Sequence, residues 1–560
     1  MNKETKNCQN CKTDFTIEPE DFSFYEKIKV PPPTWCPTCR LVRRLAHRNE
    51  RSLYKNTCGL CGASVITVYA KERGFIVYCN PCFFSDKWDA GEYGREYDFS
   101  RPFFEQFIEL QKTIPQSALL QINCVDSPWV NYETDSKNCY LNVGGSLNKD
   151  CAYNQYGLKI IDSFDNFFMY VGDFCYDNTL CENGYQVTSS LHCHDCRNTH
   201  FSFDCKNCSN IIGCSGLRNK QYQIFNKQVT KEEYGAFVKE NLNGSLANRR
   251  ALFARARDLW RSVPQRATYI EHSNNVFGNI IKESRNVREC MSAEKCDNIK
   301  YCLYTLGLRD SMDTTSVWDG ELNYEFMAGQ HSSFSRFSKS TMDTSSDIQY
   351  SAFTQGSQHL FGCVNMRGKK YCILNTQYSK EEFEELRGKI IEHMSTMPYY
   401  DRSGREYTYG EFFPPEASPF AYEESTACEW FPKSKEDVRR EGYNEMGENE
   451  VTKYEFSEYT IPDNIKDVGD EILEKTLKCE KSGKAYRIIP MELAFYRRFD
   501  LPIPRLAPFE RHKERLAFLT RNNRKMMRVC GRCKKETESY YSEQEFPIVY
   551  CNECYTQFVA

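Results

Sequence analysis

Residues 76–82, IVYCNPC, return 472 positions later as residues 548–554, IVYCNEC, and these stretches decide how both ends of the chain fold. Each holds a C-x-x-C pair, and a second such pair lies upstream of each. Two residues between the cysteines let both sulfurs point to one side of a tight turn, and two turns supply the four thiolates that tetrahedral Zn²⁺ prefers. The spacing therefore predicts a zinc ribbon near each end of the chain.

A third quartet lies closer to the N-terminus, so six C-x-x-C pairs form three sites. The expected ligand sets are Cys8/Cys11/Cys36/Cys39, Cys58/Cys61/Cys79/Cys82 and Cys530/Cys533/Cys551/Cys554. Four thiolates without an open position are typical of structural zinc. The chain has 29 cysteines, an odd number, and begins with a polar stretch unlike a secretion signal. A membrane-spanning helix needs about 20 consecutive apolar residues, and the sequence contains no apolar run of that length. We expect a cytoplasmic zinc protein rather than a disulfide-bonded or membrane protein.

The first ribbon has its own copy near the C-terminus, and this copy has lost its ligands. A shift of 471 positions aligns residues 8–44 with 479–515 without a gap. The first ligand position is still cysteine, but the other three are Ser482, Ala507 and Glu510. If each zinc took ligands from two ribbons, this loss would leave two half-liganded sites, so we assign each zinc to four successive cysteines. The degenerate ribbon forgoes roughly 10–16 kcal/mol of metal binding, and packing of its aromatic side chains is expected to hold it.

The first ribbon is similar to a known class of bacterial proteins. Phe15, Phe24, Tyr25, Pro33 and the run CPTCR at 36–40 resemble the "probable zinc-ribbon" class. Most of the chain resembles uncharacterised bacterial multi-ribbon proteins. That resemblance implies zinc and a cytosolic bacterial setting, and it implies no activity.

The middle of the chain is a second duplication, in which residues 131–234 match 279–383 with a drift of one residue. Large apolar residues follow one another at gaps of 10 to 13, with polar turn residues between them: Tyr301, Met312, Tyr324, Phe337, Tyr350, Phe361 and Tyr371. Short strands at nearly constant spacing favour a β-solenoid resembling a parallel β-helix. A β-sandwich predicts a similar strand spacing and stays as the alternative.

The expected fold class is thus multidomain and mainly β, with zinc ribbons at both ends of a duplicated β-solenoid and with capping helices. The expected parts are tandem ribbons at 1–92, a connecting helix at 93–118, β copies at 119–228 and 265–378, a helical insert at 229–264, a capping helix at 379–398, an irregular acidic linker at 399–476 and a second ribbon pair at 477–560.

A further cysteine group lies inside the first β copy, at Cys193, Cys196, Cys205 and Cys208. Two C-x-x-C pairs this close together can form a zinc loop. No ligand survives at the matching positions of the second copy. The alternative is a ladder of small apolar thiols stacked inside the solenoid.

Two basic segments beside the ribbons are the main functional clue. They are Arg40, Arg43, Arg44, Arg48, Arg51 and Lys55 after the first ribbon, and Arg511, Lys513, Arg515, Arg521, Arg524, Lys525 and Arg528 near the last. Either segment can form a helix that places cations along a phosphate backbone. A solvated charged face, or a tether for acidic residues, explains them equally well.

Catalytic signatures are weak in this sequence. Phosphate-binding glycine loops, H-E-x-x-H and G-x-S-x-G are absent. Asp162/Asp165 and Asp310/Asp313 recur as carboxylate pairs that can act as acid and base on a polysaccharide, although turn residues explain D-S-x-D more simply. The leading hypothesis is a non-enzymatic zinc protein whose partner is RNA, DNA or a ribonucleoprotein. The alternatives are a scaffold for protein partners, such as an acidic protein, and a carbohydrate-active β-helix enzyme.

Overall fold

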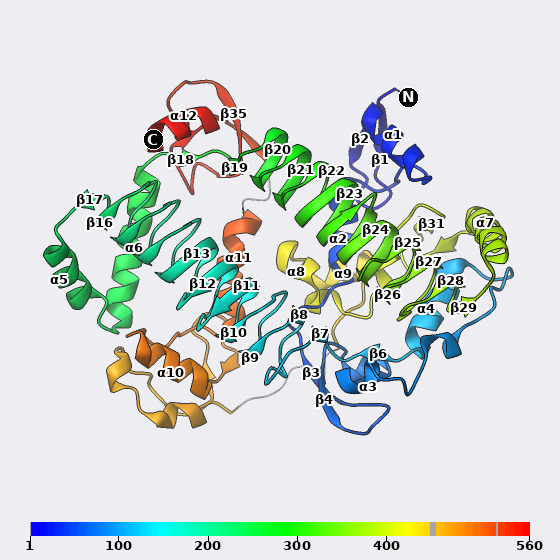
Figure 1. Ribbon diagram of the computed structural model, residues 1–560, viewed down its shortest axis with the longest axis horizontal. Helices are drawn as coiled ribbons and strands as arrows, with labels where there is room; N and C mark the ends of the chain where they lie inside the picture. The colour runs from blue at the N-terminus through cyan, green and yellow to red at the C-terminus, as the bar shows by residue number, and fades with distance from the viewer. Residues whose placement is uncertain (1, 448–454, 522–524) are drawn as a thin grey trace. The chain divides into compact units, whose positions relative to one another are not determined.

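The computed structural model describes residues 2–447, 455–521 and 525–560 (Figure 1). The described part of the chain is mainly β, with large parallel sheets and 12 α-helices. None of its helices combines the length and the apolar character that crossing a membrane requires.

The chain forms two compact units, and each draws on distant parts of the sequence. One unit comprises Met1–Leu119 and Tyr269–Glu448, and the other comprises Leu120–Thr268 and Asn449–Ala560. The N-terminal ribbons therefore belong with the second β copy, and the C-terminal ribbons belong with the first. The sequence predicted the duplicated segments, but it did not predict which ribbon pair joins which β repeat.

Each ribbon is a small hairpin followed by a helix. The first is β1(Glu4–Asn7), β2(Asp14–Ile17), α1(Pro19–Lys27) and α2(Pro37–Leu45); the second is β3(Tyr54–Thr57), β4(Ser64–Thr67), β5(Val77–Tyr78) and α3(Asn80–Phe83); the degenerate ribbon is β32(Leu477–Lys478), β33(Ala485–Tyr486), α10(Pro490–Arg498) and α11(Pro508–Arg521); the last is β34(Met526–Val529), β35(Glu536–Ser539), β36(Val549–Tyr550) and α12(Asn552–Val559). The hairpins are antiparallel in all four.

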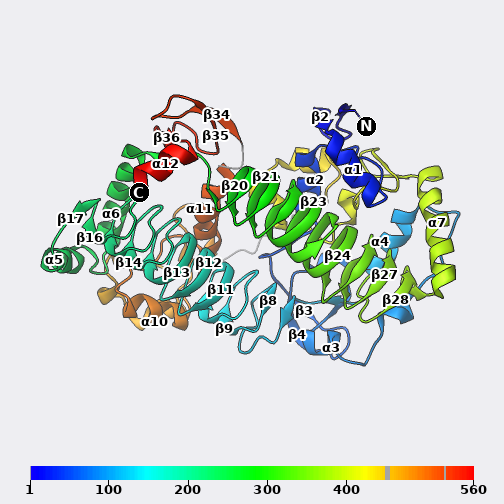
Figure 2. The same ribbon diagram turned by 45° about the horizontal axis from the view of Figure 1, so that its top comes forward.

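The first β repeat is the run β7–β17, and its main sheet has nine strands in reverse sequence order (Figure 2). Its strands are β7(Gln121–Ile122), β8(Glu133–Thr134), β9(Lys137–Tyr140), β10(Lys149–Ala152), β11(Gln155–Ile161), β12(Phe167–Asp173), β13(Thr179–Thr188), β14(Arg197–His200), β15(Ser209–Ile212), β16(Gln221–Ile224) and β17(Lys227–Gln228). Neighbours are parallel, and each residue lies opposite the one 12 positions later, as Phe167 lies opposite Thr179. Only the closing pair β16–β17 of this main sheet is antiparallel.

The second β repeat, β19–β29, is built in the same way as an 11-stranded sheet. Its strands are β19(Ile270–Glu271), β20(Asn274–Lys282), β21(Arg285–Glu294), β22(Asp297–Lys300), β23(Leu303–Glu321), β24(Tyr324–Met342), β25(Ser346–Gln349), β26(Ala352–Gln355), β27(Gln358–Phe361), β28(Lys370–Ile373) and β29(Thr376–Gln377). β23 and β24 pair in parallel over much of their length, with Met312 opposite Tyr324. Parallel pairing of this kind is not that of a β-sandwich, whose strands are antiparallel.

The backbone of the β repeats bends at regular short intervals. From Leu147 to Ser189 the φ angle is positive at every third residue, between 45° and 61°. Asn and Asp tolerate this left-handed conformation best among residues with a side chain, and they are frequent at these positions. Each bend lets the next residue point inward, so small side chains at every third position form the core of the repeat.

Cysteines dominate that core. The buried cluster of the first β repeat contains nine cysteines with Val130, Ile160, Met169, Val187 and Ile211. Their thiols donate to backbone carbonyls, as Cys193 Sγ does to Leu191 O and Ser202 O at 3.5 Å each. A neighbouring column stacks Asn154 on Asn142 and Asn166 on Asn154, with side-chain N–H···O distances of 3.3 and 2.9 Å.

Helices and short strands complete both units. They are α4(Phe103–Thr113), β6(Gln116–Ser117), α5(Lys231–Asn241), α6(Leu246–Ser262), β18(Gln265–Arg266), α7(Lys380–Thr396), β30(Tyr399–Tyr400), β31(Glu406–Tyr407), α8(Thr426–Trp430) and α9(Lys435–Arg440). Capping boxes at Thr230 and Ser379 begin α5 and α7. Gly244, at a φ of 92°, separates α5 from α6.

The stretch predicted as an irregular linker, 399–476, is largely folded. Tyr407 is 1% exposed, and Phe412 and Phe413 are fully buried. Its acidic composition concealed these aromatic residues, which join the core around the first ribbon. Residues 448–454 of this stretch lie outside the described part.

Candidate metal centres and the docking of the ribbons

The three predicted cysteine quartets are assembled. In each, the four sulfur atoms lie within 4.8 Å of one another: Cys8/Cys11/Cys36/Cys39, Cys58/Cys61/Cys79/Cys82 and Cys530/Cys533/Cys551/Cys554. Each quartet brings together successive cysteines, which is the grouping that the sequential assignment expects. All 29 cysteines are free thiols, without disulfides.

The sulfur spacing fits a tetrahedral metal. Cys11 and Cys36 have their sulfurs 3.8 Å apart, as do Cys61 and Cys79. A tetrahedron with metal–sulfur bonds of about 2.3 Å has sulfur–sulfur edges of about 3.8 Å. The donor set therefore matches a closed tetrathiolate site for a metal ion such as zinc.

Local backbone geometry prepares these sulfurs for the thiolate form. The third cysteine of each quartet is the N-cap of a helix, whose dipole favours negative charge there. Burial raises the pKa of the Cys58 thiol, but backbone N–H groups led by those of Cys61 and Cys79 outweigh it and lower the pKa to about 6. The pKa of Cys530 falls to about 6 for the same reasons.

The central cysteine group is not a fourth quartet. Among the described residues, Cys193, Cys196, Cys205 and Cys208 do not form a set of three or more ligand atoms within reach of one ion. They are at most 2% exposed and donate to backbone carbonyls along the core. Residues that stack at intervals of 12 place their sulfurs in a column rather than around a point, so the thiol-ladder alternative describes them.

The degenerate ribbon keeps its turn without its ligands. Gly483 takes a φ of 68° and donates its N–H to Cys479 O at 3.0 Å, as Gly62 does to Cys58 O at 2.9 Å. Tyr496 is fully buried, and the Phe495 ring stacks on Phe164 of the first β repeat at 4.2 Å. Aromatic packing thus supports this ribbon, as expected.

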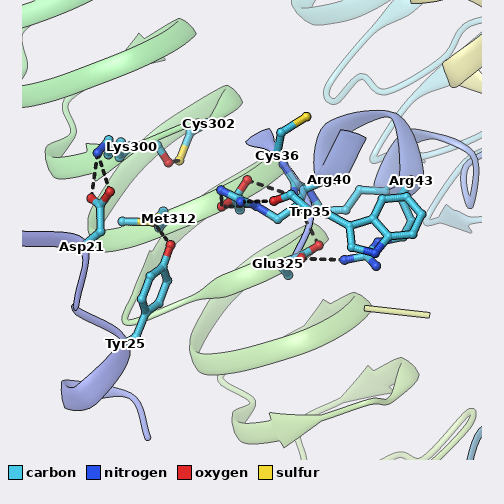
Figure 3. Close-up of polar contacts among 12 residues, drawn as sticks. Asp21, Tyr25, Trp35, Cys36, Arg40, Arg43, Lys300, Cys302, Met312 and Glu325 are labelled. Atoms are coloured by element: carbon cyan, nitrogen blue, oxygen red, sulfur yellow. Dashed lines mark hydrogen bonds and ion pairs between the residues drawn. The ribbon is translucent and has the colours of Figure 1, made fainter. Parts of the chain in front are cut away.

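The first ribbon docks on the second β repeat through buried ion pairs (Figure 3). Arg40 donates from Nε and Nη2 to Asp313 at 3.0 and 2.7 Å, and Arg44 reaches the same carboxylate at 3.2 Å. Arg43 bridges Glu325 at 2.8 Å and Glu411 at 2.9 Å. All three arginines are at most 1% exposed. Burial raises the pKa of Glu325, while Arg43 and Arg44 lower it.

The degenerate ribbon docks on the first β repeat in the same register. Arg511 and Arg515 both contact Asp165, at 3.2 and 2.9 Å, and Arg515 also reaches Asp177 at 3.2 Å. The shift of 471 turns Arg40 and Arg44 into these arginines, and a shift of 148 turns Asp165 and Asp177 into Asp313 and Glu325. The two duplications therefore carry one interface twice.

This placement corrects the prediction that the basic segments face nucleic acid. Arg40, Arg43, Arg44, Arg48, Arg511, Arg515 and Arg528 are buried, and Arg51 is paired with Glu429. A guanidinium group enclosed by carboxylates or carbonyls cannot reach a phosphate. Lys55, Lys513 and Lys525 are exposed. Arg524, and the side chain of Arg521, lie outside the described residues.

The recurring acid pairs also have a structural role. Asp165 and Asp313 are fully buried and bind the docking arginines. Asp310 is partly exposed and pairs with Lys27. Buried and charge-paired carboxylates cannot reach a sugar, so this pattern gives no support to a carbohydrate-active enzyme.

Aligning the duplicated segments with each other would have shown that the docking acids and the docking arginines both recur, and the sequence predictions missed this signal. Asp177 and Glu325 occupy matching positions of the two β repeats, and the docking arginines occupy matching positions of the two ribbons. Only the tertiary structure shows that these acids contact these arginines. Glu411 and Glu492 add further buried charges to the interfaces.

Comparison with protein-family models and with curated proteins finds no match for this sequence.

Proposed function

We propose that this chain is a non-catalytic zinc protein that acts as an interaction scaffold. In this proposal each β repeat is a solenoid with 12 residues per turn, and the ribbons pack on the solenoids. The three cysteine quartets carry the proposal, because their sulfur spacing suits zinc and leaves no open coordination position. Reduced thiols throughout the chain suit a reducing compartment such as the cytoplasm.

A scaffold is favoured over a nucleic-acid-binding protein by the fate of the basic segments. Five of their arginines hold ribbons on the β repeats, and three separate lysines are exposed: the arginines are Arg40, Arg43, Arg44, Arg511 and Arg515. Buried arginines contribute no counterion release on binding DNA or RNA. In this proposal the exposed surfaces of the ribbons bind a partner protein.

Metal analysis of the intact chain tests the zinc assignment. Native mass spectrometry is expected to find three zinc ions per chain, and two after Cys58→Ser with Cys61→Ser. The matched control, Cys193→Ser with Cys196→Ser, is expected to leave three. A metal-free folded chain, or a count that falls in the control, contradicts the assignment.

An affinity pull-down with and without nuclease separates the two kinds of partner. A scaffold keeps its co-purifying proteins after nuclease treatment. If nuclease releases them, and if Lys55→Glu with Lys513→Glu and Lys525→Glu abolishes retention on nucleic acid, the nucleic-acid hypothesis replaces the scaffold.

A further inference from the structure

A cavity of about 610 Å³ lies against the first quartet. Cys11, Cys36 and Cys39 line it, together with Val42 and with Phe431 from the end of α8. Small-molecule sites commonly have about 300–1,000 Å³. The cavity therefore offers a small ligand direct access to the metal-binding sulfurs.

Cys11 differs from the other sulfurs of its quartet. It is exposed, whereas Cys8, Cys36 and Cys39 are buried. Cys8 accepts the N–H of Cys36 at 3.2 Å, and Cys39 accepts Nδ2 of Asn10 at 3.3 Å. Such hydrogen bonds withdraw electron density from sulfur. Among the described residues, the Cys11 sulfur contacts the thiol of Cys36 and is exposed, so it is the more available nucleophile.

The charges around the cavity favour an uncharged ligand. Lys433, Arg440 and Glu441 line it, and both cations have a carboxylate partner: Lys433 pairs with Glu441 at 2.9 Å, and Arg440 pairs with Asp437 at 2.5 Å. A metal-bound quartet of thiolates is negative and repels anions. Val42 and Phe431 add apolar contact surface.

We propose that this cavity is a modification site at which Cys11 accepts an alkyl group from small uncharged electrophiles. The inference rests on the proposed zinc loading, because a metal-bound cysteine is a thiolate at neutral pH. The Cys11 sulfur donates its electron pair to the electrophilic carbon, a sulfur–carbon bond forms, and the bond to the leaving group breaks. The leaving group departs with the bonding electrons, and Cys11 becomes a thioether.

Alkylation converts an anionic ligand into a neutral, weaker one, and we expect the first site to lose its zinc. The first ribbon stays docked after this loss, because the degenerate ribbon holds the equivalent dock without a quartet. The modified protein thus differs from the unmodified one at the ribbon surface and not in its core.

Iodoacetamide is the probe for this site, and the other ribbons supply internal controls. Cys61 and Cys533 are exposed cysteines at equivalent positions of their quartets. The zinc-loaded full chain is treated with increasing reagent, and alkylation is mapped by mass spectrometry. The rate at Cys11 is expected to saturate with reagent concentration and to exceed the other two at least tenfold at low concentration. The rates at Cys61 and Cys533 are expected to rise linearly.

A cavity-filling variant separates the cavity from simple exposure. Thr38 is exposed and lines the cavity, so Thr38→Trp fills it, and Thr38→Val is the size-matched control. The first variant is expected to remove saturation at Cys11 and leave Cys61 and Cys533 unchanged. Equal linear rates at all three cysteines, or saturation that survives Thr38→Trp, overturns the proposal. Zinc content measured before treatment shows separately whether the zinc assignment itself has failed.

Discussion

Lys339 is a buried amine, and within the part of the chain that the structure describes no ion pair joins it to a carboxylate. It is 4% exposed, and its Nζ lies 3.2 Å from Nδ1 of His47 and 5.2 Å from the centre of the Phe413 ring. Burial lowers its pKa to about 7, from a usual value of about 10.4. Between these values the unfolded chain binds a proton that the folded chain does not, so stability rises with pH across this window and is lowest below about pH 7.

Lys339→Met is expected to stabilise the protein at pH 7 and to flatten this rise. Urea unfolding of both proteins between pH 7 and pH 9.5 measures the difference in free energy of unfolding, which should shrink as pH increases. Lys370→Met, at an exposed lysine of the same β repeat, should run parallel to the wild type. Parallel curves for Lys339→Met as well would show that Lys339 is charged in the folded protein.

Asp313 neutralises two buried arginines at once. Asp313→Asn leaves Arg40 and Arg44 without that anionic partner, and removing one partner of a buried pair costs about 3–5 kcal/mol. Asp310→Asn changes a partly exposed acid three residues away and is expected to cost less than about 1 kcal/mol. Denaturant unfolding compares them, and equal losses would argue against the docking role of Asp313.

At the scale of elements, the four ribbons share one fold but not one source of stability. We expect the last ribbon to depend on its quartet, whereas the degenerate ribbon is held by aromatic packing and by Arg511 and Arg515. After metal removal by a chelator, residues 530–554 are expected to lose amide protection, and residues 479–515 are expected to keep it. Hydrogen exchange read by mass spectrometry measures both. Equal exchange in the two ribbons would mean that the degenerate ribbon depends on its metal-bound neighbour.

At the scale of the molecule, each unit needs both halves of the chain. A fragment of residues 1–241 holds Arg40, Arg43 and Arg44 but lacks Asp313, Glu325 and Glu411. We expect this fragment to be insoluble when expressed alone, because the apolar surface that its ribbons share with the second β repeat would be exposed to water. Co-expression with residues 242–560 should restore a soluble complex, recovered through a tag on either fragment. A folded, monomeric 1–241 fragment would contradict the assignment of the units.

The sequence predicted much of the β repeats but missed their period. Gaps of 10 to 13 between large apolar residues lie close to the true offset of 12. The inward positions hold Cys, Ser, Asn, Gly and Ile in turn, so no single residue type marks the period. What those positions share is small size and a place directly after each bend, which only the backbone geometry reveals.

The sequence by itself determined the three cysteine quartets, both duplications and the lost cysteines, because the cysteines of a quartet lie close along the chain and their spacing is local. Only the tertiary structure decided that the basic segments are buried and which β repeat each ribbon joins. Arg40 meets Asp313 across 273 residues, and Arg43 meets Glu411 across 368. An arginine in an amphipathic segment gives the same sequence pattern whether its side chain faces water or a carboxylate that is distant in the sequence. Its role is therefore decided by long-range packing.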